Sequence, residues 1–110
     1  MTYEHAIYEN VFTALADPTR RHIFEALRAR PQTVGELAAD QPVSRPAVSQ
    51  HLKVLETAHL VSVEPQGNRR LYKIKRDGLE ELRTYLDGLW SDALFAYGAE
   101  IANRIKMKTE

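Results

Sequence analysis

The sequence predicts a mainly α-helical fold with one small β-hairpin. Apolar residues recur at helical spacing through most of the chain, which is typical of amphipathic helices. One stretch, residues 61–75, instead alternates apolar and polar side chains around a glycine-containing turn, as paired strands do. The chain has 110 residues, a length that fits one domain, and we expect residues 1–110 to form a single one.

The first two helices are predicted from an apolar stripe and a restart of the chain. Residues 3–16 carry apolar side chains at helical spacing and form the first helix. Asp17 and Pro18 begin a second helix, because Asp is a good N-cap and Pro is favoured at the first helical position. This helix ends before Pro31, since the residue that precedes a proline disfavours helical backbone.

Two further helices are predicted from their N-caps. Thr33 and Glu36 have the spacing of a capping box, which predicts a short third helix that ends near Asp40. Ser44 caps a fourth helix that extends to about Ala58. Apolar residues at spacings of four and three indicate the buried face of this helix. The face consists of Val48, Leu52 and Leu55.

The last predicted elements are the hairpin and a long helix. Val61 and Val63 share one face of the first strand, residues 65–70 supply turn residues, and Tyr72 belongs to the returning strand. A helical apolar pattern then occupies residues 77–110 and exceeds 25 residues. A helix of this length is expected to pack against something beyond its own small domain.

Two short helices joined by a tight turn and followed by a hairpin form a helix-turn-helix with a wing. In such a unit the second helix enters the major groove of DNA and the hairpin lies against the backbone. We therefore expect Gln50 to pair with adenine, Arg45 with guanine, and Lys53 to hold a phosphate. Arg20 and Arg21 are further candidates for a phosphate contact. The candidate DNA-binding residues are Ser44, Arg45, Ser49, Gln50, His51, Lys53, Arg69, Arg70 and Lys73.

The distribution of charge favours DNA binding over an ordinary solvated surface. The chain has 15 basic and 15 acidic residues, so its net charge is zero. Residues 41–76, however, hold seven basic and two acidic side chains, whereas both ends of the chain are acidic. Basic groups in this segment would neutralise phosphates and release counterions. Two candidates also have structural explanations: Ser44 is first a helix cap, and Lys73 on an edge strand protects against strand-to-strand aggregation.

Two segments resemble the ArsR/SmtB family of bacterial repressors. They are residues 11–21, VFTALADPTRR, and residues 43–55, VSRPAVSQHLKVL, and the resemblance covers roughly residues 7–90. It implies a homodimeric winged-helix protein that binds an operator and leaves it when an effector arrives. One departure is His59, where the family commonly has glycine, so His59 must adopt a left-handed or strained helix exit.

The resemblance also implies that the first and last helices form the dimer interface, in agreement with their apolar stripes. We therefore expect residues 1–16 and 77–110 to be dimerisation helices. Trp90 and Tyr97 would also fit the wall of a ligand pocket, although aromatic residues at helical spacing are more often dimer core. The expected interface residues are Ile7, Val11, Leu86, Trp90, Leu94 and Tyr97.

The metal ligands known from the family are missing. Metal-sensing relatives carry a Cys-x-Cys pair on the third helix, where this chain has residues 36–40 and no cysteine. Others use Asp and His on the last helix, and residues 77–110 contain no His. We expect no cofactor and no metal. The inducer is left open among a small organic molecule, a protein and none at all.

The sequence contains no enzyme motif, because a nucleophile elbow, a His-Glu-x-x-His pair and a phosphate-binding glycine loop are all missing. Its apolar runs are too short to span a bilayer and its N-terminus lacks a signal-peptide layout, so we expect a cytoplasmic protein without a membrane partner. The predicted function is a sequence-specific transcriptional regulator, a dimeric (auto)repressor on a palindromic double-stranded operator. Two alternatives stay open: a winged helix used for protein–protein contacts, and a repressor with an atypical metal site built from His5 or carboxylates.

Overall fold

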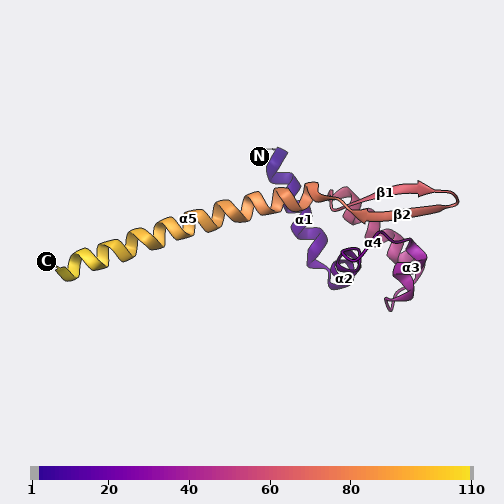
Figure 1. Cartoon of the computed structure of the whole chain (residues 1–110), viewed down its shortest axis with the longest axis horizontal. Coiled ribbons are helices and arrows are strands. Elements are labelled where there is room, and N and C mark those ends of the chain that lie inside the picture. The colour runs from indigo at the N-terminus through magenta and orange to yellow at the C-terminus, as the bar shows by residue number, and fades with distance from the viewer. Residues whose placement is uncertain (1–2, 110) are drawn as a thin grey trace.

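The computed structural model describes residues 3–109, with side chains for residues 9–107. Within this range the chain forms helices at both ends and a two-stranded antiparallel sheet, in the order that the sequence predicts. Figure 1 shows α2, α3, α4 and the hairpin gathered at one end, with α5 extending from them to the other. The elements are α1 (Tyr3–Ala16), α2 (Pro18–Ala26), α3 (Val34–Ala39), α4 (Arg45–Thr57), β1 (Val61–Gln66), β2 (Arg69–Ile74) and α5 (Arg76–Thr109).

Three predicted N-caps define the starts of α2, α3 and α4. The Asp17 carboxylate accepts a hydrogen bond from the Arg20 amide at 3.0 Å, with Pro18 in the first helical position. Thr33 and Glu36 form the predicted capping box. The Ser44 hydroxyl accepts from the amide three residues later at 3.3 Å. Each bond satisfies an amide that has no partner within its own helix.

Arg20 and Arg21 stabilise the corner between α1 and α2. The Arg20 guanidinium donates to the Ala14 carbonyl at 2.6 Å and to the Thr13 carbonyl at 3.1 Å. Arg21 donates to the Leu15 carbonyl at 2.8 Å. The last carbonyls of a helix lack partners within the helix, so these bonds cap the C-terminal end of α1. The sequence suggested only a phosphate contact for these two arginines. In the structure both of them stabilise the end of α1 instead of remaining without a structural role.

The hairpin is longer than expected, and its base is tied to the loop before α3. Pairing runs from Val61 opposite Ile74 to Gln66 opposite Arg69, which leaves a turn of two residues. Gly67 has a φ of +62° in this turn, a conformation that costs glycine little. Gln32, which is buried, exchanges two backbone hydrogen bonds with Tyr72, at 2.9 and 2.8 Å. The prediction of a turn over residues 65–70 was therefore wrong by two residues on each side.

The core lies between α1, α2, α3, α4 and the base of the hairpin. The predicted inner face of α4 is fully buried in it. Val11, expected at a dimer interface, is also 0% exposed and packs into this core, so it has no surface left for a second subunit. The expectation for Val11 was wrong because α1 turns this residue towards its own subunit. Its neighbour Phe12 is 44% exposed and takes the outward position.

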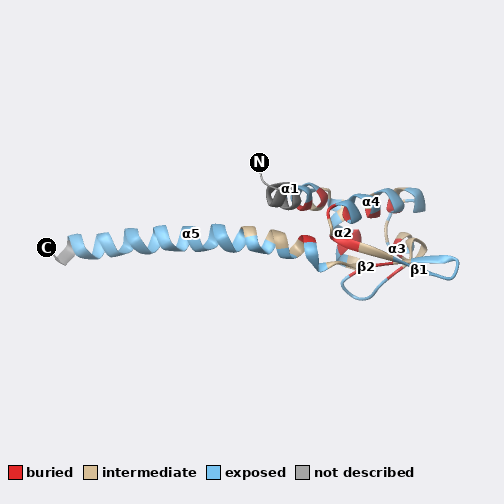
Figure 2. Cartoon of the chain, turned by 90° about the horizontal axis from the view of Figure 1, so that it is seen from above, coloured by how far each residue is buried: buried red, intermediate tan, exposed pale blue. Residues whose placement is uncertain are grey.

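The start of α5 packs against the core, whereas the rest of this helix lies outside it. Leu79 and Leu82 pack against the core, and the rings of Phe12 and Tyr85 meet edge to face with centroids 5.9 Å apart. From residue 86 to residue 107 every residue is exposed, as Figure 2 shows by its pale blue colour. None of the described helices is long and apolar enough to cross a membrane.

Candidate nucleic-acid interface

Polar side chains form one continuous strip along α4. Arg45, Ser49 and Lys53 are each four residues apart, so they fall on one side of a helix with 3.6 residues per turn. All three are exposed, because the buried face of α4 points into the core. Gln50 is exposed as well, about 100° further round the helix. The strip and Gln50 leave α4 with an outward surface free of large apolar side chains except Val54.

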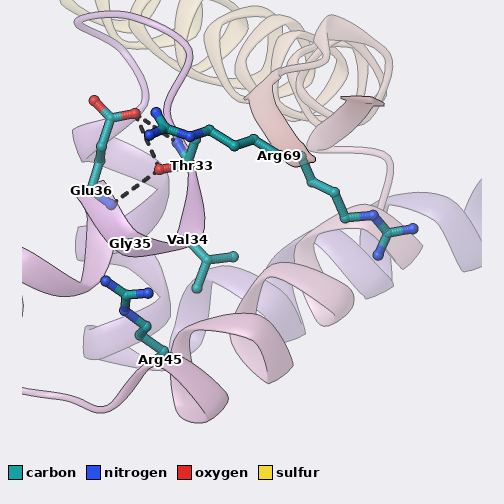
Figure 3. A pocket seen from close by; sticks show the side chains of 7 residues that line it. Thr33, Val34, Gly35, Glu36, Arg45 and Arg69 are labelled. Atoms are coloured by element: carbon teal, nitrogen blue, oxygen red, sulfur yellow. Dashed lines mark hydrogen bonds between the residues drawn. The ribbon is translucent and has the colours of Figure 1, made fainter. Parts of the chain in front are cut away.

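A basic groove lies between the start of α3, the start of α4 and the hairpin. It has a volume of about 470 Å³, and three guanidinium groups line it, those of Arg45, Arg69 and Arg70. Figure 3 shows Arg45 beside Gly35, where a Cβ atom would lie 3.2 Å from a guanidinium nitrogen. The remaining residues of the groove are Thr33, Val34 and Glu36.

The one acidic side chain in this groove is already balanced by another residue. Arg30 donates to a Glu36 carboxylate oxygen at 2.8 Å, and the Thr33 amide donates to the other at 3.1 Å. The hydrogen bond from Arg30, followed by that from the Thr33 amide, holds the pKa of Glu36 below its usual value. Glu36 therefore stays ionised but is paired, and the three arginines leave the groove positively charged.

A second groove joins the strip on α4 to the hairpin. It has a volume of about 420 Å³, and Ser49, Lys53 and Arg70 are among the residues that line it. Arg70 borders both grooves, so the outer faces of α4 and of the hairpin form one surface. The fold thus brings together most of the residues that the sequence nominates for DNA contact.

Three of the residues that the sequence nominates for DNA contact interact with other parts of the subunit or are partly buried in it. The Ser44 hydroxyl caps α4, and the Lys73 ammonium forms an ion pair with Glu64 on the neighbouring strand. His51 lies near the start of α2 and is half-buried. A hydrogen bond from the Arg20 amide, with smaller contributions from the charges of Arg20 and His51, holds the pKa of Asp17 below its usual value.

Comparison with known proteins identifies the family. The family model described as "Bacterial regulatory protein, arsR family" matches residues 17–63. The chain is 57% identical over 89 residues to the HTH-type transcriptional regulator Rv2034 of Mycobacterium tuberculosis, a match that covers 81% of this chain and 83% of Rv2034. The chain belongs to the ArsR family. It is therefore a DNA-binding transcription regulator and not an enzyme.

Two further relatives of this ArsR-family chain agree in sequence and fold. The transcriptional repressor SdpR of Bacillus subtilis is 35% identical over 72 residues, covering 66% of this chain and 80% of SdpR. The structure of an ArsR-like transcriptional regulator from Rhodococcus sp. RHA1 is 32% identical, with a TM-score of 0.75, and covers 89% of this chain and 94% of that one. The matched region of the family model extends from the N-cap of α2 into β1.

The histidines of this ArsR-family chain are spread over separate elements. His22 lies on α2, His51 on α4 and His59 after α4, while the side chain of His5 lies outside the described residues. Among the residues that the structure describes, no group of three His, Cys, Asp or Glu side chains is placed to hold a metal ion.

Proposed function

We propose that the chain is a dimeric repressor that binds a palindromic operator through α4 and the hairpin. The observation that carries the proposal is the single basic surface on which the two grooves meet at Arg70. A surface of this shape fits a duplex, because a helix fits the major groove while basic side chains beside it neutralise phosphates. Repression is supported by the likeness to SdpR, which is described as a transcriptional repressor.

The residues of this surface fall into two groups, those proposed to contact bases and those proposed to contact phosphates. Gln50 and Arg45 lie towards the first turns of α4, where a helix in the major groove presents side chains to base edges. Gln pairs with adenine and Arg with guanine through two hydrogen bonds each. Lys53, Arg69 and Arg70 line the two grooves and would hold phosphates on either side. Ser49 lies between these two groups on the strip.

Ser44, His51 and Lys73 remain proposed contacts of lesser weight. Ser44 caps α4 and Lys73 pairs with Glu64, while His51 is half-buried and its charge acts on Asp17, the N-cap of α2. A contact from any of them to DNA would have to compete with this interaction or add to it. Their replacement should therefore change affinity less than replacement of Arg69 or Gln50.

The proposed dimer forms through the outer part of α5. Leu86, Trp90 and Leu94 are four residues apart and share one face with Tyr97, and they are between 46% and 66% exposed. A contiguous apolar stripe of this kind rarely remains in water on a lone subunit, and a second copy of the same helix supplies a matching stripe about a two-fold axis. Phe12 replaces Val11 as the contribution of α1, and the side chain of Ile7 lies outside the described residues.

We further propose that the whole chain is one DNA-binding domain with terminal dimerisation helices. We also propose that it binds no metal ion, either at the family's known sites or elsewhere. The chain has no cysteine and no histidine after His59, which removes the usual ligands. Elemental analysis of the purified protein and a thermal-shift screen against divalent ions test this. A bound metal, or stabilisation by one ion at low concentration, would support an atypical site and contradict the proposal.

Selection of bound sequences from a random duplex pool tests the proposed function. We expect a palindrome with two half-sites about one helical turn apart or more. The matched variant Gln50→Ala should enrich a more degenerate sequence at one position of each half-site, because a bidentate base contact discriminates by about 1–3 kcal/mol. Failure to enrich any sequence would overturn the proposal in favour of a winged helix that binds proteins.

A further inference from the structure

The end of α4 and the start of α5 meet in a tightly bonded joint. His59, the residue after α4 and its cap, has a φ of +60°. The amides of His59 and Leu60 donate to the carbonyls of Glu56 and Leu55, each at 3.0 Å, which is the pattern of a Schellman motif. Leu55 and Leu60 are both fully buried and supply the apolar contact that accompanies this motif. The chain therefore leaves α4 in one fixed direction.

The first turn of α5 bonds to this exit. The Gly78 amide donates to the His59 carbonyl at 2.8 Å, and the Lys75 amide donates to the Leu60 carbonyl at 2.9 Å. Early amides of a helix have no partner inside it, and carbonyls at the end of a helix have none either. Of these groups only the Gly78 amide belongs to a helix, α5, and the His59 carbonyl just after α4 satisfies it. The first turn of α5 is thus bonded directly to the chain that leaves α4.

Only glycine fits at residue 78. A Cβ atom there would lie 2.5 Å from the Ala58 carbonyl oxygen and 2.8 Å from the His59 carbonyl oxygen, inside van der Waals contact. Both atoms are backbone, so no side chain can turn aside to make room. At Gly88 and Gly98, on the same helix, a Cβ atom would meet nothing within 4 Å. The need for glycine at residue 78 thus comes from the contact with α4 and not from α5 itself.

We propose that Gly78 is a positioning residue that sets the direction of α5 relative to α4, and thereby the spacing of the two half-sites that the dimer reads. The inference rests on the proposed function, in which α5 forms the dimer and α4 enters the groove. If the dimer is held through the outer part of α5, the joint orients each α4 within it, together with the packing of Leu79 and Leu82 against the core. The operator spacing is then determined in part by a residue that does not contact DNA.

The length of α5 makes the spacing sensitive to this joint. The dimerisation stripe is centred near Trp90 and Leu94, about 20 Å along the helix from Gly78 at 1.5 Å per residue. A tilt of about 10° at the joint would displace α4 relative to that point by about 3.5 Å, close to the 3.4 Å rise of one base pair. We expect the backbone shift that admits a methyl group at residue 78 to tilt α5, and a tilt of this size would change the preferred spacing by about one base pair.

The experiment compares Gly78→Ala with the wild type and with the matched control Gly88→Ala. Circular dichroism and sedimentation first establish that each variant is folded and dimeric. Affinity is then measured for a single half-site and for the selected palindrome with its half-sites moved closer or further by one and two base pairs. We expect Gly78→Ala to bind the single half-site like the wild type but to lose about 10-fold or more at the original spacing, the order that one lost base-pair contact costs. Gly88→Ala should match the wild type throughout.

Several outcomes separate this inference from the proposed function. A wild type that binds no palindrome defeats the proposed function, and with it the premise about spacing. A folded, dimeric Gly78→Ala variant with the wild-type spacing profile overturns the role of Gly78 alone. If Gly78→Ala fails to fold, hydrogen exchange of the wild-type dimer carries the test. Slow exchange of the Gly78 amide, comparable with amides in the middle of α4, supports a rigid joint, and fast exchange overturns it.

Discussion

Arg69 is the residue at which the electrostatic part of DNA binding can be measured most cleanly. It is exposed beside the hairpin turn and lines the basic groove. Its guanidinium has no ion pair among the residues that the structure describes, in contrast to Lys73, which pairs with Glu64. A phosphate contact by such a side chain contributes to the affinity for every sequence and gives no base preference.

Replacing Arg69 by alanine should weaken binding to selected and scrambled duplexes by a similar factor and lower the salt slope by about one unit, because one fewer counterion is released. Arg83→Ala removes the same charge from an exposed position on α5, far along the chain from the groove, and serves as the control. Fluorescence anisotropy across a series of salt concentrations gives both slopes. Equal slopes for Arg69→Ala and Arg83→Ala would contradict the phosphate contact.

Glu36 gives the stability of the fold a predictable dependence on pH. Its pKa is lowered in the folded chain from an ordinary value of 4.5, first by the hydrogen bond from Arg30, so the unfolded chain binds a proton more readily. The stabilisation is therefore fully present above the ordinary value and is lost as the pH falls through the lowered pKa. In urea titrations from neutral to acidic pH, Glu36→Gln should lose less stability than the wild type, since glutamine does not titrate. Parallel curves would show that Glu36 does not contribute this pH dependence.

At the residue scale, helix caps could be predicted from the sequence. Contacts between segments that only the fold brings together could not. The caps at Asp17, Thr33 and Ser44 depend on amides within three residues, so their spacing in the sequence is sufficient. Arg20 bonds to a carbonyl six residues earlier, across a corner whose angle no local pattern specifies. The same holds for Gly78, whose need for glycine comes from a contact with residues 58 and 59.

At the scale of elements, α5 differs most from an ordinary helix of a small domain. Its first two turns pack against the core through Leu79 and Leu82, and it then continues to Thr109 with exposed apolar side chains. Trp90 is 66% exposed at the middle of the stripe that we propose for the dimer. In an isologous interface each such side chain occurs twice, so one substitution removes two buried groups.

Trp90→Glu should convert the dimer to a monomer at concentrations where the wild type is dimeric. Burial of a large apolar side chain contributes about 1.5–3 kcal/mol, and two lost copies raise the dimer dissociation constant by about 100-fold or more. The control is Phe95→Glu, because Phe95 is 81% exposed but lies about 100° round the helix from Leu94, off the stripe. Sedimentation equilibrium measures both. A dimeric Trp90→Glu variant, or a monomeric Phe95→Glu variant, would locate the interface elsewhere.

Element boundaries were predicted well wherever a cap or a change of period marks them. The predicted hairpin turn, residues 65–70, was too long. Pro65, Gly67 and Asn68 are common in turns, but pairing across the strands continues to Gln66 and Arg69. Val11 was misplaced for a related reason: helical spacing shows that a residue lies on an apolar face but not which neighbour covers it. The structure settles this by burying Val11 in its own subunit and leaving Phe12 partly exposed.

At the scale of the whole molecule, the zero net charge is the sum of a basic middle segment and two acidic ends. Basic side chains of residues 41–76 border the two grooves, and the acidic ends belong to the helices that we propose for dimerisation. The winged helix-turn-helix and the ArsR family follow from the sequence, because the order of elements and two local motifs specify them. The operator and any effector do not, since they depend on atoms outside this chain.

The most direct measurement is the affinity of the purified wild type for the selected palindrome and for a scrambled duplex of the same length, at one physiological salt concentration. A dimer that reads both half-sites should bind the palindrome at least about 10³-fold more tightly, with one dimer per duplex. Halving the palindrome should remove most of this difference. Equal affinity for the palindrome and the scrambled duplex would contradict sequence-specific reading by α4.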